Sequence, residues 1–414
     1  MTVFKKNEIL DNFKKLTPFY SRKLNGAGDF NDAPLTSKHE LLSSQKNHPP
    51  FGNFTNKKVA ISQIYRTSGT SSNPLLLTFS KKDIDFITDI GNECLRYAGM
   101  GKLGNNEIVI NCLNLSMWVG GVLDSQSISK TGVQVINFGA GNTSELIRLI
   151  KELGLSKKNK ISLHCTPSYL PHIASRLETE YGMSPQNLNI YSFYLGGESG
   201  IQNNYYRKTL IEKWGSKIIN ANYGMSEICS ALASANDEKN VLRFAPLFTQ
   251  KYFIELRNSK GEINDFENLK EGDNGEMIVT AYEKESQPLF RYNTKEILRI
   301  VKKDKKNLFF EILGRTDDML IYKGINVFPE QFRSIISNFN ELTGLYQLQV
   351  NKQNDIVEKI TLICETHKGT KINELELKNK LAVKIKSELS ILPSIIFTKK
   401  INIEGNKIKL IQFV

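Results

Sequence analysis

The sequence predicts a mixed α/β protein: a large N-terminal domain and a small α+β C-terminal domain. Three observations carry this prediction. Between residues 108 and 220, short apolar runs alternate with amphipathic helical segments, which indicates a doubly wound parallel sheet. Between residues 252 and 313, short apolar runs follow one another at hairpin spacing, which predicts an antiparallel β subdomain. After Gly314 the pattern begins again as a separate small unit of helices and strands.

Length and composition agree with this division. A chain of 414 residues is too long for one compact core, and 40% hydrophobic residues suffice for a sizeable interior. No apolar run approaches the ~18 residues of a membrane-spanning helix, and the N-terminus lacks the apolar region of a signal peptide. We therefore expect a soluble cytoplasmic protein. The five widely spaced cysteines, without a C-x-x-C pair, fit reduced core residues better than disulfides or a zinc site.

The N-terminal third is expected to contain two helices. The first is predicted over residues 7–16, because its apolar side chains fall on one helical face. An irregular stretch over residues 21–60 follows. Ser80 and Asp83 form a capping box that opens a second helix, whose apolar residues extend to Ala98.

The remaining elements follow from apolar periodicity. Parallel strands are predicted over residues 108–113, 133–138, 161–165, 188–195 and 217–220, with helices over 143–153, 167–181 and 203–214. Antiparallel strands are predicted over residues 252–256, 276–280, 297–301 and 308–313. The C-terminal unit should contain helices over residues 329–338 and 373–389 and strands over 346–350, 359–364 and 394–398.

Residues 67–74, Thr-Ser-Gly-Thr-Ser-Ser-Asn-Pro, separate two apolar runs. A glycine among small hydroxyl residues lets the backbone approach a ligand closely, and hydroxyls with free N–H groups can cradle phosphate oxygens. Such clusters are more often plain turns. The interpretation as a phosphate loop therefore depends on the motifs that follow it.

Several other motifs are excluded by their context. Residues 99–104 spell G-x-G-x-x-G, but they follow a predicted helix and precede a predicted strand, the reverse of a dinucleotide-binding turn. Residues 139–143 lack the third glycine and indicate a tight turn into a capped helix. The chain has no complete Walker A, G-x-S-x-G or H-E-x-x-H sequence.

Four motifs follow the phosphate loop in order: YGMSE at residues 223–227, PLFRYNT at 288–294, GRTDD at 314–318 and EGNKIK at 404–409. Together with the loop they resemble the adenylate-forming enzymes, most closely their phenylacetate–CoA ligase branch. The resemblance extends from about Leu16 to the end of the chain. It also fits a nucleotide-dependent enzyme without an obvious side-chain nucleophile, in which a bound carboxylate attacks the α-phosphate of ATP.

The resemblance implies a set of ATP-binding residues. The phosphate loop would hold the β and γ phosphates, although Asn73 stands where the family usually has lysine. Tyr223 would stack on adenine, and Glu296 occupies the place of an aspartate that binds the ribose hydroxyls. The complete implied set is Ser68, Gly69, Thr70, Ser71, Ser72, Gly197, Glu198, Ser199, Tyr223, Gly224, Ser226, Glu296 and Arg315.

Catalytic roles are implied for two residues. Glu227 would bind Mg²⁺, while a helix-start carboxylate is the ordinary structural explanation. Lys407 would reach the reacting carboxylate and α-phosphate, with Lys409 as its nearest rival. A lone lysine is more commonly just solvated.

The resemblance also implies that the small domain is mobile. Asp317 would be the hinge between a large domain over residues 1–316 and a small domain over 317–414. Gly324 would let the pantetheine arm of a thiol acceptor pass close to the backbone. The resemblance implies a thiol acceptor, which is either CoA or the phosphopantetheine of a carrier protein. The sequence does not decide between the two.

The acid pocket is expected along residues 114–121, 164–169 and 193–197. Trp118, Tyr169 and Phe193 suit a flat aromatic acid, such as phenylacetate or a hydroxybenzoate used in siderophore or other secondary-metabolite synthesis. Aromatic residues in such places are often part of the core.

Three alternatives remain open. An amine acceptor would give an amide ligase, and the substitutions at Asn73 and Glu296 allow a degenerate nucleotide-binding protein. The net charge of +12 allows a nucleic-acid binder, but the lysines are spread through the chain without a recognised nucleic-acid motif. We therefore expect a lysine-rich surface that helps to attract ATP, no nucleic-acid or membrane partner, and a monomer or homodimer.

Overall fold

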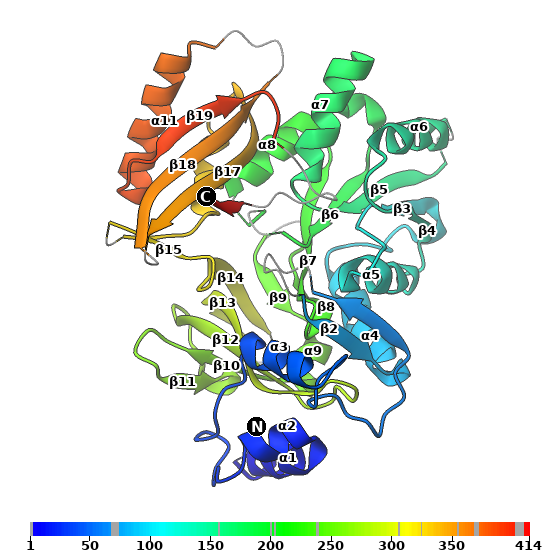
Figure 1. The fold of residues 1–414 in the computed structure, drawn as a ribbon. Helices are drawn as coiled ribbons and strands as arrows, with labels where there is room; N and C mark the ends of the chain where they lie inside the picture. Colours follow the sequence, from blue (N-terminus) through cyan, green and yellow to red (C-terminus); the bar gives the residue numbers. More distant parts are fainter. Residues whose placement is uncertain are drawn as a thin grey trace. The chain divides into compact units, whose positions relative to one another are not determined.

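The computed structural model describes residues 3–67, 74–155, 158–198, 201–202, 204–236, 240–304, 307–323, 325–353, 356–367, 372–401 and 410–414. Internal contacts divide the chain into two compact units. Unit 1 comprises residues 1–102, 115–132 and 221–313, and unit 2 comprises residues 103–114, 133–220 and 314–414. The mixed α/β class predicted from the sequence is confirmed (Figure 1).

Unit 1 is built on an antiparallel sheet. Its strands are β8 (Cys229–Ser234), β9 (Leu242–Phe244), β10 (Phe253–Arg257), β11 (Ile263–Asp265), β12 (Asn274–Ala281), β13 (Leu289–Lys303) and β14 (Leu308–Arg315). They run in the order β11-β10-β12-β13-β14-β9-β8, and residues 221–225 of β7 (Lys217–Met225) follow β8. A separate hairpin joins β1 (Gln63–Arg66) to β2 (Leu76–Phe79), so the predicted phosphate loop connects two paired strands.

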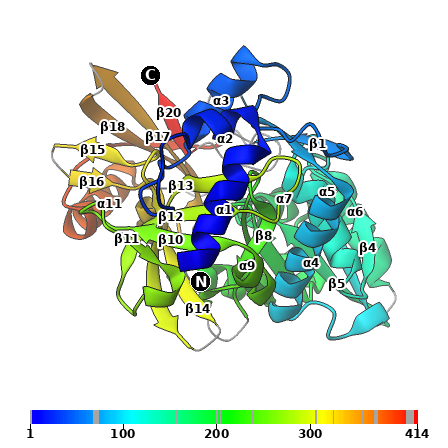
Figure 2. The same ribbon diagram turned by 90° about the horizontal axis from the view of Figure 1, so that it is seen from below.

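The helices of unit 1 are α1 (Val3–Leu16), α2 (Pro18–Lys23), α3 (Lys38–Asn47), α4 (Lys81–Tyr97), α5 (Val119–Ser129) and α9 (Pro246–Lys251). The predicted capping box is present, because the Ser80 and Asp83 side chains bond each other's backbone at the start of α4. Helices α4 and α5 lie side by side against β8 (Figure 2). The sequence did not predict α5, because polar residues such as Asp124 and Ser127 are buried in it alongside the apolar ones, so its pattern is not amphipathic. Helix α3 corrects the expectation that residues 21–60 are irregular.

Unit 2 contains the parallel sheet. Strands β3 (Glu107–Asn111), β4 (Gln134–Asn137), β5 (Lys160–Cys165) and β6 (Ser192–Gly196) pair in parallel in the order β6-β5-β3-β4, and the start of β7 follows β6. Helices α6 (Thr143–Gly154), α7 (Tyr169–Tyr181) and α8 (Asn204–Trp214) connect them. The prediction of a capped helix after residues 139–143 is confirmed, since Asn142 accepts the Glu145 N–H at the start of α6.

The C-terminal part of unit 2 is a second small sheet. Its strands are β15 (Leu320–Tyr322), β16 (Ile325–Val327), β17 (Leu342–Gln353), β18 (Ile356–Thr366), β19 (Ser394–Thr398) and β20 (Ile411–Phe413). Helices α10 (Gln331–Ile336) and α11 (Glu374–Leu389) cover it (Figure 1). The two helices and three of the strands match the predicted C-terminal pattern.

Two predicted strands have different bounds in the structure. The strand predicted over residues 188–195 begins only at Ser192, because residues 185–188 form a 3-10 turn that ends at Asn189 with a positive φ of 51°. The strand predicted over residues 297–301 is the second half of β13, which starts at Leu289 and contains the PLFRYNT motif except for its proline. Positive φ angles at Arg291 and Lys295 interrupt its regular geometry.

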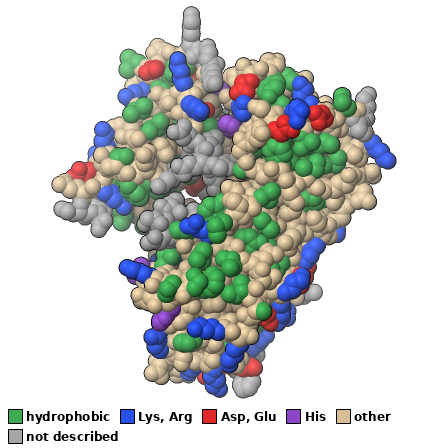
Figure 3. Space-filling view, turned by 45° about the vertical axis from the view of Figure 1, so that its right-hand side comes forward, with side chains coloured by type: hydrophobic (Ala, Val, Ile, Leu, Met, Phe, Trp, Pro, Cys, Tyr) green, Lys and Arg blue, Asp and Glu red, His purple; other side chains and the backbone are tan. Residues whose placement is uncertain are grey.

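The surface charges are dispersed on the face shown in Figure 3, where Lys and Arg side chains lie among acidic and neutral ones. All five cysteines are buried free thiols. Among the residues that the structure describes, no helix is both long and apolar enough to cross a membrane.

The core of unit 1 contains a buried ion pair. The Arg291 guanidinium, 1% exposed, donates to both carboxylate oxygens of Glu255 at 3.0 and 2.9 Å. Its Nη1 atom also donates to the carbonyls of Phe30, Asn31 and Ala33. Burial raises the pKa of Glu255, and the adjacent Arg291 charge opposes this shift. The pair thus joins β10 and β13 to the irregular N-terminal segment.

We expect Glu255→Gln to lower the free energy of unfolding by about 3–5 kcal/mol, because the mutation leaves a buried guanidinium without its counter-charge. Urea denaturation measures this loss. The matched control is Asp85→Asn, which breaks an exposed i,i+4 pair with Lys81 on α4 and should cost less than about 1 kcal/mol. Equal, small losses in both variants would contradict the structural role of the buried pair.

Candidate active site

Glu227 lies in the tight turn between β7 and β8, at the end of the YGMSE motif. The residue is only 8% exposed. Oε1 lies 2.9 Å from Nζ of Lys38, the first residue of α3, and accepts a hydrogen bond of 3.3 Å from the Tyr292 hydroxyl on β13. The carboxylate is therefore held by groups from two elements far apart in sequence.

The backbone of the same turn is held from a third direction. Nζ of Lys284 donates to the carbonyl oxygen of Glu227 at 2.7 Å. Lys284 is 2% exposed, and burial lowers the pKa of its ammonium group to about 8, while Asp83 and Glu227 oppose the shift.

Gly224 is required by close packing rather than by an unusual φ. A Cβ atom at this position would lie 1.9 Å from the carbonyl oxygen of Ser230 on the neighbouring strand β8. Tyr223, beside it, is half-buried and contacts Phe310 edge to face with ring centroids 5.7 Å apart. Ser226 is also half-buried in this turn. The motif thus places an aromatic ring and a carboxylate within one constrained turn.

Glu296, the predicted ribose ligand, lies on β13 in unit 1 and is half-buried. Its N–H group donates to Oγ1 of Thr294 at 3.2 Å. Its proposed contact with ribose stays a prediction.

Gly197 and Glu198 follow β6 in unit 2. Gly197 has a φ of 77°, which favours glycine at this position. The Glu198 carboxylate accepts hydrogen bonds from Ser168 N–H at 3.1 Å and Ser168 Oγ at 2.8 Å. Ser168 immediately precedes α7, so these bonds fix the end of β6 against the start of the next helix.

Arg315 and Asp317 form a local pair in unit 2. Nε and Nη2 of Arg315 donate to the two Asp317 carboxylate oxygens at 2.9 and 2.8 Å. Asp317 is exposed, so the pair itself contributes little stability. Burial, and then the adjacent charge of Asp317, raises the pKa of Asp318. The hinge role of Asp317 stays a prediction.

The three aromatic residues predicted for the acid pocket have different surroundings. Phe193 is fully buried and contacts Trp214 with ring centroids 4.8 Å apart, which favours a core role. Tyr169 is buried, and its hydroxyl is hydrogen-bonded to Oγ1 of Thr143 at 3.0 Å. Trp118 is half-buried at the start of α5 in unit 1, where it forms a β-bridge with Arg66. Their assignment to an acid pocket stays a prediction.

Several predicted residues lie outside the described ones: Ser68, Gly69, Thr70, Ser71, Ser72, Ser199, Gly324 and Lys407, with the rival Lys409. The base of the predicted phosphate loop is described. The Thr67 N–H donates to the Leu75 carbonyl at 3.0 Å, and the Leu75 N–H donates to Thr67 Oγ1 at 3.0 Å.

Sequence reasoning did not assign roles to Lys38, Lys284 or Tyr292. Lys38 follows Ser37, the N-cap of a capping box with Glu40 that opens α3, so a helix start was recognisable there. Tyr292 belongs to the PLFRYNT motif, but its partner Glu227 is 65 positions away. Pairs this distant in sequence follow no local periodicity.

The Glu227 site is chemically suited to Mg²⁺ carried by a nucleotide. Mg²⁺ commonly takes one or two protein carboxylates and completes its coordination with phosphate oxygens and water. Within the described ranges, no group of three or more His, Cys, Asp and Glu side chains is arranged to hold a metal by itself. A single carboxylate therefore fits an ion that arrives with a phosphate ligand.

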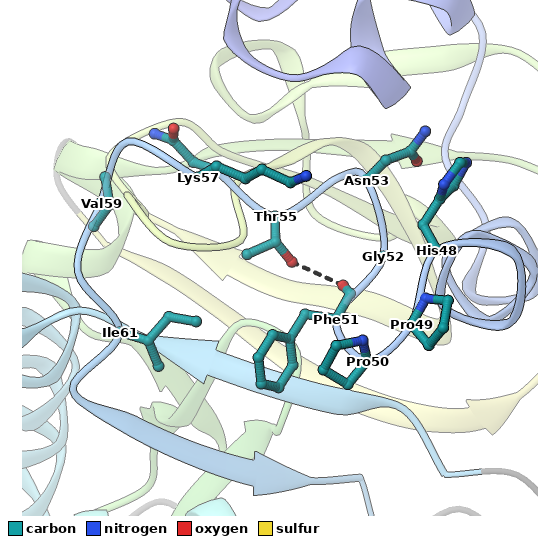
Figure 4. Close-up of a pocket in the computed structure, with 11 residues that line it drawn as sticks. His48, Pro49, Pro50, Phe51, Gly52, Asn53, Thr55, Lys57, Val59 and Ile61 are labelled. Carbon is teal, nitrogen blue, oxygen red and sulfur yellow. Dashed lines mark hydrogen bonds between the residues drawn. The ribbon is translucent and has the colours of Figure 1, made fainter.

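A separate pocket of about 480 Å³ lies in the irregular N-terminal segment of unit 1, between His48 and Ile61 (Figure 4). Its rim carries His48 and Lys57, and the Thr55 hydroxyl donates to the Phe51 carbonyl at 2.8 Å. None of the predicted ATP-binding or acid-binding residues lines this pocket.

Comparison with known proteins points to one superfamily. Residues 324–414 match the model of the AMP-binding enzyme C-terminal domain. Phenylacetate-coenzyme A ligase from Escherichia coli is 26% identical over 81% of this chain and 75% of its own length. The enzyme of the same name from Thermus thermophilus is 27% identical over 82% of this chain and 75% of its own length.

The fold comparison covers the full chain. A crystal structure of 2-hydroxyisobutyryl-CoA ligase in the postadenylation state, in complex with 2-HIB-AMP, has a TM-score of 0.82 at 18% identity. The match covers 100% of this chain and 88% of the 2-hydroxyisobutyryl-CoA ligase chain. Together the C-terminal domain match and the two ligases support assignment of this chain to the adenylate-forming superfamily, in which it is phenylacetate–CoA ligase-like. The enzyme class expected from the motifs, an AMP-forming acid–thiol ligase, is likewise supported by these relatives.

Substitution of Gly224 tests the packing of the YGMSE turn. We expect Gly224→Ala to weaken ATP binding by roughly tenfold or more and to lower the thermal midpoint, because strand β8 must move away from the new methyl group. Calorimetric titration with ATP and a thermal melt measure the two effects. Gly28→Ala is the control, since its Cβ would meet nothing within 4 Å. Unchanged ATP affinity in Gly224→Ala would contradict the role of the turn.

Proposed function

We propose that this protein activates a carboxylic acid with ATP, forming an acyl-AMP and pyrophosphate, and transfers the acyl group to the thiol of CoA. The observation that carries this proposal is the alignment of phenylacetate-coenzyme A ligases over about four-fifths of the chain, with the YGMSE turn built as described. The relatives' name favours an aromatic acid of the phenylacetate type.

The chain's own residues support the first half-reaction as follows. In this proposal the 67–74 loop binds the β and γ phosphates, and Tyr223 with residues 197–199 binds adenine. Glu227 is the residue to hold Mg²⁺, which would offset charge on the phosphates when bound. The substrate carboxylate attacks the α-phosphate and pyrophosphate leaves, so no side-chain nucleophile is needed.

Lys407 is proposed to donate to the reacting carboxylate and α-phosphate, and Arg315 to ribose or phosphate. In the second half-reaction, the thiol attacks the acyl carbon and AMP leaves. Gly324 belongs to the segment proposed to accommodate the pantetheine arm. A carrier-protein phosphopantetheine is the alternative acceptor, and a hydroxybenzoate for siderophore or other secondary-metabolite synthesis is the alternative acid.

Three organisational predictions accompany this function. The large domain comprises residues 1–316 and the small one residues 317–414, with Asp317 as the hinge. The protein acts in the cytoplasm as a monomer or homodimer. These predictions come from the sequence and the resemblance.

Acid-dependent ATP–pyrophosphate exchange tests the first half-reaction. We expect exchange with arylacetic or benzoic acids to exceed that with aliphatic and amino acids. Lys407→Ala should lower the rate by roughly 100-fold or more, because it removes a charged donor to the transition state. Lys409→Ala is the matched control and should retain most of the rate.

Each outcome has a definite meaning. Loss of exchange in Lys409→Ala with retention in Lys407→Ala would move the catalytic role to Lys409. Absence of exchange with every acid, despite measurable ATP binding, would contradict the proposed function and favour a degenerate nucleotide-binding protein.

A further inference from the structure

Burial of the Lys284 ammonium group costs free energy, and packing of the fold alone does not explain why a lysine occupies this position. Lysines are almost never fully buried unless they are paired, because the ammonium group loses its hydration. Here the group is 2% exposed, donates to the Glu227 carbonyl at 2.7 Å and lies 4.6 Å from the centroid of the Phe79 ring. Asp83, also buried, supplies a nearby negative charge. These contacts partly offset the cost of burial and place the ammonium against the backbone of Glu227, the residue predicted to bind Mg²⁺.

The residues after Lys284 hold a second part of the predicted ATP site. The Glu285 and Ser286 N–H groups donate to the two Asp83 carboxylate oxygens at 2.7 and 3.0 Å. The hydroxyls of Ser286 and Thr78 are hydrogen-bonded at 2.7 Å. Thr78 lies on β2, the strand that leaves the phosphate loop.

Gln287 completes this attachment to β2. Its side-chain oxygen accepts the Thr78 N–H at 3.1 Å, and its amide nitrogen donates to the Leu76 carbonyl at 3.3 Å. Residues 284–287 therefore bond to the Glu227 turn through Lys284 and to the strand following the phosphate loop through Ser286 and Gln287. One short segment fixes both within unit 1.

We propose that Lys284 is a positioning residue for adenylation, which holds the Glu227 turn in place relative to β2, the strand that follows the phosphate loop; Glu227 would be the residue that holds nucleotide-bound Mg²⁺. This inference rests on the proposed function. Lys284 touches the carbonyl of Glu227 and not its carboxylate, so it acts through Glu227. Its removal takes away the Nζ donor that binds the Glu227 carbonyl, so the turn loses this constraint on its position.

The positioning role predicts a selective defect. Glu227 and the phosphate loop are needed while ATP is bound with its pyrophosphate, and not after the acyl-AMP has formed. A variant at Lys284 should therefore lose Mg²⁺-dependent ATP affinity and exchange activity, while thioester formation from supplied acyl-AMP and CoA is preserved. A merely structural role would reduce both half-reactions together with stability.

The experiment compares Lys284→Met with Lys82→Met in the full chain. Methionine keeps much of the length and removes the ammonium. Lys82 is the matched control, because its side chain is 64% exposed and its ammonium bonds Glu285 at 3.0 Å in the same region. Calorimetric titration measures ATP affinity with and without Mg²⁺. Pyrophosphate exchange and thioester formation are then measured separately, and thermal melts report stability.

We expect Lys284→Met to weaken Mg²⁺-dependent ATP binding and to slow exchange by roughly tenfold or more, with thioester formation within about twofold of wild type. Lys82→Met should remain within about twofold in every assay. Lys284→Gln, which keeps an N–H donor without charge, should show the same selectivity more weakly. If Lys284→Met does not fold, the same assays are made with Lys284→Gln instead.

The inference is overturned if Lys284→Met or Lys284→Gln keeps wild-type ATP affinity in the presence of Mg²⁺, or if both half-reactions fall equally. A wild-type protein that binds Mg²⁺ and ATP but exchanges pyrophosphate with no acid would instead contradict the proposed function. In that case the binding comparison alone still decides the role of Lys284.

Discussion

The buried pair between Arg291 and Glu255 is the interaction on which the rest of unit 1 depends. It joins β13 to β10, and the same guanidinium binds three carbonyls of the segment that leads from α2 to α3. The adjacent residue, Tyr292, donates to Glu227. Arg291, which pairs with the buried Glu255 carboxylate, therefore also helps to position β13, the strand that carries Tyr292 to the candidate active site.

The residues of the candidate site come from elements that are far apart in the sequence. Glu227 lies in a β-turn, Lys38 begins a helix, and Lys284 precedes the strand of Arg291. One lysine, Lys38, pairs with the Glu227 carboxylate, and the other, Lys284, binds the carbonyl oxygen of the same residue. Such a cluster suits the binding of a polyanionic nucleotide with its metal ion, because the protein charges are already oriented before the ligand arrives.

Sequence patterns predicted the elements whose signals are local. The amphipathic helix α4, the capped helix α6 and the parallel strands β3, β4 and β5 lie within a few residues of their predicted bounds. The buried helix α5 was missed, because periodicity cannot reveal a helix that packs on several sides. The YGMSE turn was predicted from its motif, and its Gly224 proves to be fixed by contact with β8. The roles of Lys38 and Lys284 could not be predicted, since they depend on pairings across the folded chain.

The central claim is that a substrate carboxylate attacks the α-phosphate of ATP. The most direct test is incubation with ATP, Mg²⁺, CoA and phenylacetate labelled with ¹⁸O in its carboxylate, followed by mass analysis of the nucleotide products. Direct attack predicts AMP that carries one labelled oxygen, formed together with unlabelled pyrophosphate and an acyl-CoA. Formation of ADP, or AMP without label, would contradict it.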